Sequence, residues 1–174
     1  MTPMDTILPH ELVSLARRVI EENAAIGRRV AVAESCTGGL VAAALTEIPG
    51  SSDVVEASFV TYSNTAKRAV LGVSDDVLDT FGAVSIATAW KMAQGALDLS
   101  GADVAVSITG IAGPGGGSES KPVGTVVFAR AEKGADPEKP VADLKTFENN
   151  GRAGVRLQAA LCALDLLLPV AEGK

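Results

Sequence analysis

The segment Ala33-Glu34-Ser35-Cys36-Thr37-Gly38-Gly39 joins a strand-like apolar run at residues 30–33 to an alanine-rich, helix-like run at residues 40–45. The first backbone N–H groups of a helix lack partners within the helix, and the helix dipole favours negative charge beside them. Such a junction can hold an anion, or it can activate Ser35 as a nucleophile next to donors that stabilise an oxyanion. The structural alternative is that Ser35 or Thr37 caps the helix while the two glycines permit close packing.

Outward from this junction, strand-like and helix-like segments alternate along the chain. The patterns predict strands at residues 28–33, 56–62, 103–109, 124–131 and 141–147. They predict helices at residues 8–25, 40–46, 65–71, 85–99 and 154–168, with another helix beginning near residue 74, and residues 63–64 are expected to cap the third helix. Such alternation with short connections predicts an α/β fold, a three-layer α/β/α sandwich. Because no helix separates the last two strands, part of the sheet should be antiparallel, within a mixed, mostly parallel sheet.

Size and composition bound the classes of protein that this chain can represent. Its 174 residues, 47% of them hydrophobic, suffice for one well-filled domain, so residues 1–174 are interpreted as a single domain. Aromatic residues make up 3% and the net charge is −6, which argues against direct nucleic-acid binding through stacked bases and clustered cations. No apolar run approaches the roughly 18 residues of a membrane span, and residues 1–5 lack a secretory pattern, so we expect a cytoplasmic protein with no membrane partner.

The cysteines and the histidine limit the chemistry further. Cys36 and Cys162 lie far apart without ligand-like spacing, so neither a metal site nor a disulfide framework is expected. The single histidine, His10, lies near the N-terminus, which argues against a Ser-His-Asp triad. A serine nucleophile in this chain therefore needs another base.

Tyr62 and Lys67 are candidates to assist such a serine. They flank a predicted strand-to-helix turn at a separation of five residues, so both side chains can reach one cleft. A partly desolvated lysine loses proton affinity and can then act as a base toward a serine hydroxyl. The alternative is an interfacial tyrosine and a solvated lysine.

Two further features can hold a ligand. The glycine-rich loop at residues 109–121 can turn its backbone N–H groups inward, forming an anion-binding nest. Its sequence matches neither a P-loop nor a dinucleotide fingerprint. The alternative is that this segment is a flexible surface loop. Arg152 and Arg156, four residues apart on the last helix, share one face. Either can grip a phosphate or carboxylate, while solvation at the surface is the usual role of such a pair.

As a set, these residues resemble the CinA C-terminal domain family, whose characterised members are nicotinamide-nucleotide amidases. The resemblance rests on residues 33–39, 59–67, 82–85, 107–114, 118–119 and 121–126, and covers nearly the whole chain. It implies hydrolysis of the carboxamide of nicotinamide mononucleotide to nicotinic acid mononucleotide and ammonia, in pyridine-nucleotide recycling, without a metal or organic cofactor. The implied partner is the small nucleotide substrate.

The resemblance also assigns roles to individual residues. It implies a catalytic set of Ser35 as nucleophile, with Lys67 and Tyr62 moving protons. Candidate oxyanion donors and ligand contacts are then the residues Cys36, Thr37, Gly38, Thr109, Gly110 and Gly113. Where the family commonly has Gly-Asp-Arg before the last helix, this chain has Asn150-Gly151-Arg152, so the aspartate is absent and Arg152 is expected to contact phosphate or another part of the substrate.

Three alternatives stay open at the level of the sequence. The domain can be a non-catalytic nucleotide-binding or adaptor module linked to competence or DNA-damage responses, as the older name of the family suggests. Cys36 can be the nucleophile instead of Ser35, because thiols at helix starts are activated. The apolar last helix is compatible with a homodimer.

Overall fold

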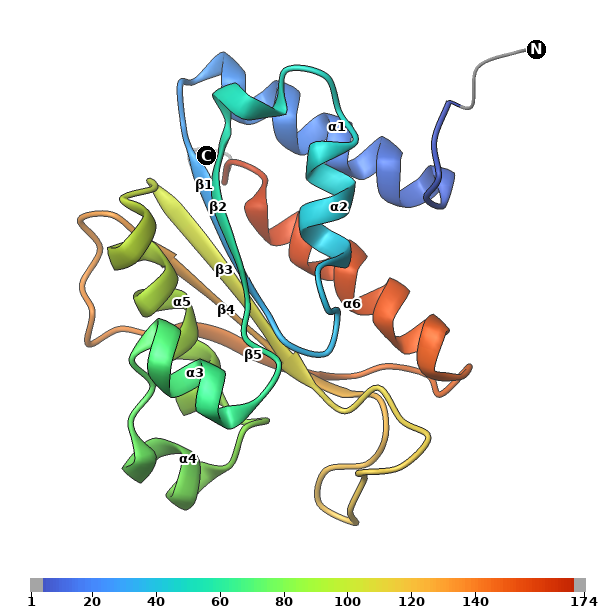
Figure 1. The fold of residues 1–174 in the computed structure, drawn as a ribbon, viewed down its shortest axis with the longest axis vertical. Coiled ribbons are helices and arrows are strands. Elements are labelled where there is room, and N and C mark those ends of the chain that lie inside the picture. Colours follow the sequence, from blue (N-terminus) through green and yellow to red (C-terminus); the bar gives the residue numbers. More distant parts are fainter. Residues whose placement is uncertain (1–4, 171–174) are drawn as a thin grey trace.

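The computed structural model describes residues 5–170 and places one mixed sheet between two layers of helices (Figure 1). Residues 1–4, on which the prediction about secretion partly rests, lie outside the described residues. Within this range the sheet has the order β2-β1-β3-β4-β5, from strands β1 (Val30–Glu34), β2 (Val55–Val60), β3 (Val104–Gly110), β4 (Thr125–Glu132) and β5 (Val141–Thr146). Strands β2, β1 and β3 pair in parallel, whereas β4 pairs antiparallel with both β3 and β5. Of the described strands, β4 therefore runs against the other four, which confirms the predicted mixed, mostly parallel sheet.

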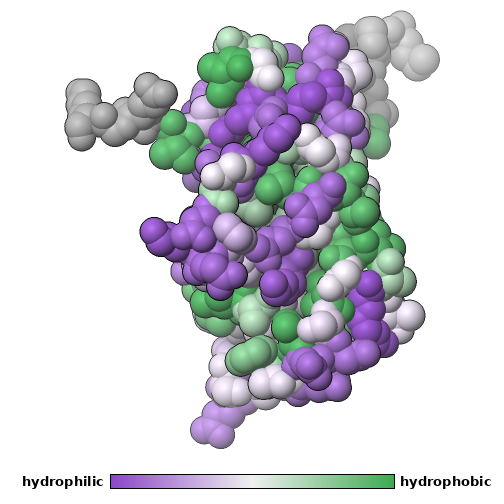
Figure 2. All heavy atoms as spheres, turned by 90° about the vertical axis from the view of Figure 1, so that its left-hand side faces the viewer, coloured by the Kyte–Doolittle hydropathy of each residue, from purple (hydrophilic) through white to green (hydrophobic). Residues whose placement is uncertain are grey.

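The helices divide between the two faces of the sheet, as the predicted sandwich requires (Figure 1). One face carries α1 (His10–Ala25), α2 (Leu40–Thr46) and α6 (Arg152–Leu167), and the other carries α3 (Asn64–Leu71), α4 (Asp75–Phe81) and α5 (Ile86–Ser100). The helices expected from the sequence match these bounds to within a few residues. On its outer surface, the layer of α3, α4 and α5 mixes hydrophilic with hydrophobic residues (Figure 2).

Alternation along β1 explains why the two helical layers differ in their packing. Val30 and Val32 point to the core under α1, α2 and α6, while Ala31 and Ala33 point to the core under α3 and α5. Successive side chains of a strand face opposite sides of the sheet, so one face is lined by large residues and the other by small ones. The small residues allow the layer of α3 and α5 to pack close to the sheet.

Local capping fixes the position of α3, which carries Lys67. The Ser63 hydroxyl accepts a hydrogen bond from the Ala66 N–H at 3.0 Å, which is the usual contact of a serine at the start of a helix. Gly72 ends the helix in the left-handed conformation, with φ of +68°, which a residue with a side chain rarely adopts. The same capping pattern begins α4 at Ser74 and α5 at Ser85.

No helix within residues 5–170 has the length and apolarity required to cross a bilayer. In the same range, no cluster of three or more His, Cys, Asp or Glu side chains is arranged to hold a metal ion.

Candidate active site

Ser35 and Lys67 meet at one edge of the sheet, although 32 positions separate them in the sequence. Ser35 follows β1 and Lys67 lies in α3, directly after β2, and these two strands are parallel neighbours that end at the same edge. The Lys67 Nζ donates to Ser35 Oγ at 3.0 Å, and both side chains are buried, with exposed fractions of 1% for Lys67 and 7% for Ser35. The predicted convergence of these two residues is therefore present in the structure.

Lys67 is surrounded by neutral acceptors. Its Nζ also lies 3.0 Å from the Thr61 carbonyl oxygen and 3.3 Å from that of Tyr62, and none of the ion pairs found in residues 5–170 includes it. Burial lowers the pKa of Lys67, an effect that the nearby Cys36 partly opposes. A neutral amine has two hydrogens and one lone pair, and carbonyl oxygens can only accept. If the deprotonated amine keeps its two hydrogens on the two carbonyls, its lone pair is left for Ser35, whose hydroxyl then becomes the donor in their 3.0 Å contact.

Glu34 caps α2, a role that the sequence interpretation gave to Ser35 or Thr37. Its carboxylate is fully buried and accepts hydrogen bonds from the Thr37 hydroxyl at 2.7 Å, the Val41 N–H at 3.0 Å and the Ala42 N–H at 3.1 Å. The first N–H groups of the helix are thus already occupied by an anion from the protein. Sequence reasoning missed this residue, although a glutamate at the end of an otherwise apolar strand was the available signal.

Arg156, from α6, holds the loop that follows Ser35. Its Nε donates to the Cys36 carbonyl at 3.2 Å and its Nη2 donates to the Thr37 carbonyl at 3.0 Å. Within the loop, the Gly38 N–H donates to the Ser35 carbonyl at 3.0 Å. Arg156 was predicted as one of two residues that can grip an anion, but here it binds the backbone oxygens of Cys36 and Thr37.

Tyr62 approaches this pair through its backbone, while its side chain lies elsewhere. The carbonyl of Tyr62 contacts Lys67, but the phenol is 60% exposed and accepts a hydrogen bond from Arg152 Nη2 at 2.8 Å. Arg152 Nη1 donates in turn to the Gly113 carbonyl at 2.8 Å. Within residues 5–170, the phenol forms no hydrogen bond with Ser35 or Lys67. The structure thus brings Tyr62, Arg152 and Gly113 together as a second group.

The other predicted ligand contacts have structural partners. The Thr109 hydroxyl donates to the Ala83 carbonyl at 2.8 Å, and Thr109 is buried. A Cβ at Gly110 would lie 2.7 Å from Val126 Cγ2, and one at Gly113 would lie 2.5 Å from Val123 Cγ1. Close packing accounts for both glycines.

Cys36 is a poor candidate for the nucleophile. Burial raises the pKa of the Cys36 thiol to about 11, and the charge of Glu34 adds to this shift. The thiolate is the reactive form of cysteine, and at neutral pH such a group is almost entirely protonated. The geometry favours Ser35 over Cys36.

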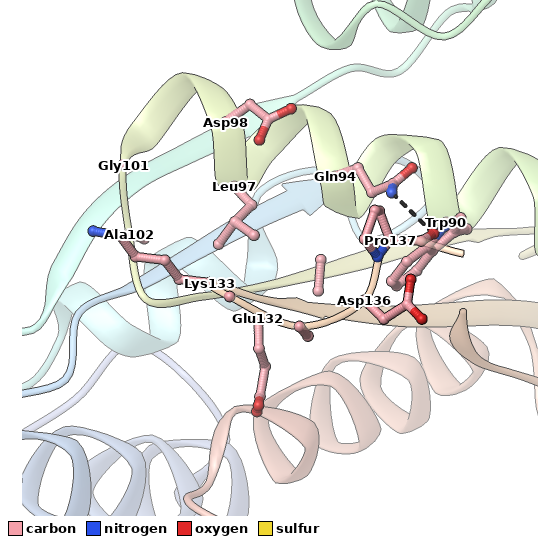
Figure 3. Close-up of a pocket in the computed structure, with 13 residues that line it drawn as sticks. Trp90, Gln94, Leu97, Asp98, Gly101, Ala102, Glu132, Lys133, Asp136 and Pro137 are labelled. Carbon is pink, nitrogen blue, oxygen red and sulfur yellow. Dashed lines mark hydrogen bonds between the residues drawn. The ribbon is translucent and has the colours of Figure 1, made fainter. Parts of the chain in front are cut away.

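A cavity of about 400 Å³ lies away from Ser35 and Lys67, between α5 and the turn that joins β4 to β5 (Figure 3). Trp90 and Gln94 border it from the helix, and both side chains donate to the Pro137 carbonyl in the turn. None of the residues that line this cavity belongs to the loop at residues 35–39 or to α3.

Comparisons with known proteins identify relatives of this chain. The family model described as the CinA C-terminal domain matches residues 12–171. A protein named nicotinamide-nucleotide amidohydrolase PncC, from Enterobacter agglomerans, is 52% identical over 139 residues, which cover 80% of this chain and 82% of that protein. A CinA-like protein from Mycobacterium avium is 50% identical over 142 residues, but this chain spans only 32% of its length.

Solved structures agree with the fold. The crystal structure of the competence/damage inducible protein CihA from Agrobacterium tumefaciens is similar to this chain with a TM-score of 0.88 and 49% identity, covering 93% of this chain and 96% of that one. A CinA superfamily protein from Klebsiella pneumoniae gives a TM-score of 0.83 at 37% identity, covering 90% and 94% respectively. These likenesses extend over nearly the entire sandwich.

Proposed function

This chain belongs to the CinA C-terminal domain family, and from that premise we propose that it hydrolyses the carboxamide of nicotinamide mononucleotide to nicotinic acid mononucleotide and ammonia. The observation that carries the proposal is the buried 3.0 Å contact between Lys67 Nζ and Ser35 Oγ, in which the amine belongs to none of the ion pairs found in residues 5–170. The name of the PncC relative at 52% identity supports the choice of substrate.

The first half of the reaction forms an acyl-enzyme. Ser35 Oγ attacks the carboxamide carbon while Lys67 accepts the hydroxyl proton. The tetrahedral intermediate then collapses, Lys67 returns that proton to the departing nitrogen, and ammonia leaves. The Thr61 and Tyr62 carbonyls hold the amine in place, so its lone pair stays directed at Ser35.

The second half releases the acid. A water molecule attacks the ester carbon on Ser35, and Lys67 accepts a proton from that water. Collapse of the second tetrahedral intermediate breaks the ester bond, and Ser35 Oγ recovers its proton from Lys67. The N–H groups of Cys36 and Thr37 are the candidate donors that stabilise both intermediates, because the Gly38 N–H already donates to the Ser35 carbonyl.

Arg152 supplies the positive charge that a mononucleotide phosphate requires. Its guanidinium binds the Tyr62 hydroxyl and the Gly113 carbonyl, and none of the ion pairs found in residues 5–170 includes it. Guanidinium groups bind phosphate through paired, charge-assisted hydrogen bonds. One uncompensated cation at the site thus attracts an anionic ligand to a protein whose net charge is −6.

A nucleotide-binding or adaptor module is the second candidate, because several relatives carry competence-damage names. Binding alone gives no reason to bury an amine against a serine hydroxyl, since that arrangement costs desolvation energy. We therefore place the amidase first. The two candidates differ in turnover, which the following experiment measures.

Ammonia release from nicotinamide mononucleotide tests the proposal. The unmodified protein should release ammonia, and Ser35→Ala should lose nearly all turnover while still binding the nucleotide. Ser52→Ala, which removes an exposed hydroxyl on a short turn, is the matched control and should behave as the unmodified protein does. Binding without ammonia release by the unmodified protein would instead support the adaptor module.

A further inference from the structure

Two charged side chains, those of Glu34 and Arg156, hold the loop after Ser35. Thr37 is fully buried between them: its hydroxyl donates to Glu34 at 2.7 Å, and its carbonyl accepts from Arg156 at 3.0 Å. Arg156 also binds the Cys36 carbonyl at 3.2 Å. The two peptide units that follow the nucleophile therefore have fixed carbonyl directions.

Fixing these carbonyls also fixes the adjoining N–H groups. A trans peptide unit is planar, and its C=O and N–H bonds point in opposite directions. The units that join residues 36–37 and 37–38 are trans, so their carbonyls point toward Arg156 on α6 and their N–H groups point away from it. The Gly38 N–H already donates to the Ser35 carbonyl at 3.0 Å, which leaves the Thr37 N–H for an oxyanion. In acyl transfer, N–H groups stabilise the developing oxyanion and a carbonyl oxygen in the same place would repel it.

The loop needs such a restraint because its other end is conformationally permissive. Gly38 and Gly39 have φ values of +58° and +97°, and glycine passes between backbone conformations with little steric cost. Rotation of a peptide unit beside them would exchange the positions of a carbonyl and an N–H group. Glu34 holds the side chain of Thr37 and the start of α2, and the Leu40 N–H donates to the Thr37 carbonyl at 3.1 Å. Among the described residues, only Arg156 donates to the Cys36 carbonyl.

Arg156 has no competing ionic partner for this task. None of the ion pairs among the described residues includes it, whereas Arg18 on α1 pairs with Glu22 at 3.1 Å. Its guanidinium is half-buried and two of its nitrogens are directed at loop oxygens.

We propose that Arg156 is a positioning residue for the hydrolysis at Ser35: it keeps the Cys36 carbonyl turned away from the oxyanion, so that the Thr37 N–H of the same peptide unit faces it. This inference rests on the proposed function for its substrate. In this proposal Arg156 holds the loop at residues 36–38, whereas Arg152 binds the phosphate.

Kinetics of Arg156→Gln and Arg156→Lys test the proposal, with Arg18→Gln as the matched control on an exposed helix face. Arg156→Gln should lower kcat by about 100-fold, the usual cost of a misplaced reacting group or oxyanion donor, with little change in KM. Arg156→Lys keeps the charge but lacks the planar fork, so it should recover only part of the loss. An unchanged kcat, or a raised KM with kcat retained, would overturn the proposal.

Chemical rescue separates positioning from simple destabilisation. Guanidinium ion at millimolar concentration should restore turnover to Arg156→Ala in a saturable manner and leave Ser35→Ala inactive. A merely destabilised protein would gain nothing from the ion, so failure of rescue in a variant that melts near the unmodified protein counts against the proposal. If Arg156→Ala and Arg156→Gln melt below the assay temperature, Arg156→Lys provides the kinetic comparison.

A second substrate keeps this inference separable from the proposed function. Acetylation of Ser35 by p-nitrophenyl acetate, followed by mass spectrometry of the intact protein, needs the nucleophile and its oxyanion donors but no nucleotide. The Arg156 variants should acylate more slowly than the unmodified protein and Arg18→Gln. If the unmodified protein is acylated but releases no ammonia from nicotinamide mononucleotide, the proposed substrate is wrong, while the acylation rates still test Arg156. Equal acylation rates for the Arg156 variants and the unmodified protein would overturn the positioning role.

Discussion

Lys67 is buried, although lysine side chains are normally solvated at the protein surface. It is 1% exposed, bonds to two carbonyls and one hydroxyl, and has no carboxylate partner among the ion pairs of the described residues. Burial without a counter-ion disfavours the ammonium form and lowers the pKa of Lys67. The amine can thus be neutral at a pH where surface lysines are charged.

The pH profile of turnover should report this group. A general base works in its deprotonated form, so kcat/KM should rise with pH through the pKa of Lys67, which lies below the usual 10.5, and fall at lower pH. Lys67→Met should lower kcat by about 10²- to 10⁴-fold, the usual contribution of a general base. Lys133→Met changes an exposed lysine and serves as the control. Near-normal turnover of Lys67→Met would remove Lys67 from the mechanism.

Arg152 gives a prediction about substrate affinity. Loss of a charged hydrogen bond to phosphate costs about 1.5–3 kcal/mol, so Arg152→Gln should raise KM for nicotinamide mononucleotide by about 10- to 100-fold. Nicotinamide riboside, which lacks the phosphate, should be hydrolysed equally by both proteins if it is hydrolysed at all. A KM that stays the same for the mononucleotide would exclude phosphate binding by Arg152.

Tyr62→Phe distinguishes two roles for the phenol. The structure bonds the phenol to Arg152, which favours a small rise in KM with kcat retained. The family resemblance implies proton transfer, which would instead reduce kcat as strongly as Lys67→Met does.

At the scale of elements, the sequence predicted most of the fold because its signals are local. Serine caps at Ser63, Ser74 and Ser85 and the glycine stop at Gly72 mark helix ends through contacts within a few residues. The expectation that Lys67 meets Ser35 came from the place of Lys67 after a strand-to-helix turn and from the resemblance.

Longer-range contacts escaped prediction. The Arg156 contacts cross about 120 positions, and the Tyr62 phenol met Arg152, 90 positions away, instead of Lys67. Spacing within a segment cannot show which distant side chain competes for a donor. Glu34 escaped for another reason: a buried carboxylate that caps a helix seven residues further on matches no standard capping pattern.

The packing of α3 on α5 gives a prediction about stability. A Cβ on Gly95 would lie 2.2 Å from the Leu71 carbonyl oxygen, which belongs to the backbone and cannot move aside cheaply. Alanine normally stabilises a helix relative to glycine by about 1 kcal/mol, but overpacking costs about 1–3 kcal/mol, so Gly95→Ala should lower the free energy of unfolding.

Gly154→Ala on α6 is the matched comparison for Gly95→Ala. There the close neighbour is the exposed side chain of Asn150, which can rotate away, so chemical denaturation should show a smaller loss or a gain. Equal effects at both glycines would contradict the importance of the α3–α5 contact.

At the scale of the whole molecule, the buried amine couples stability to pH. In the unfolded chain Lys67 has its ordinary pKa of about 10.5, whereas in the folded protein the pKa of Lys67 is lower. Between these two pKa values the unfolded state binds more protons, so folding becomes more favourable as pH rises. The stability of the unmodified protein relative to Lys67→Met should therefore increase with pH in that window, by at most about 1.4 kcal/mol per pH unit, and stay constant below it. Urea denaturation at several pH values measures this difference, and a flat difference up to pH 10.5 would contradict the lowered pKa.

Helix α6 has a consequence for how this domain can diversify. Arg152 and Arg156 lie one turn apart on it, one beside the proposed ligand-binding edge and the other against the loop at residues 36–38, while Val155 and Ala159, each three positions after one of these arginines, pack into the core. A volume change at those core positions would shift both guanidinium groups together. Substitutions remote from any ligand can thus retune affinity and turnover jointly, which gives natural selection a route to altered specificity that leaves every reacting side chain intact.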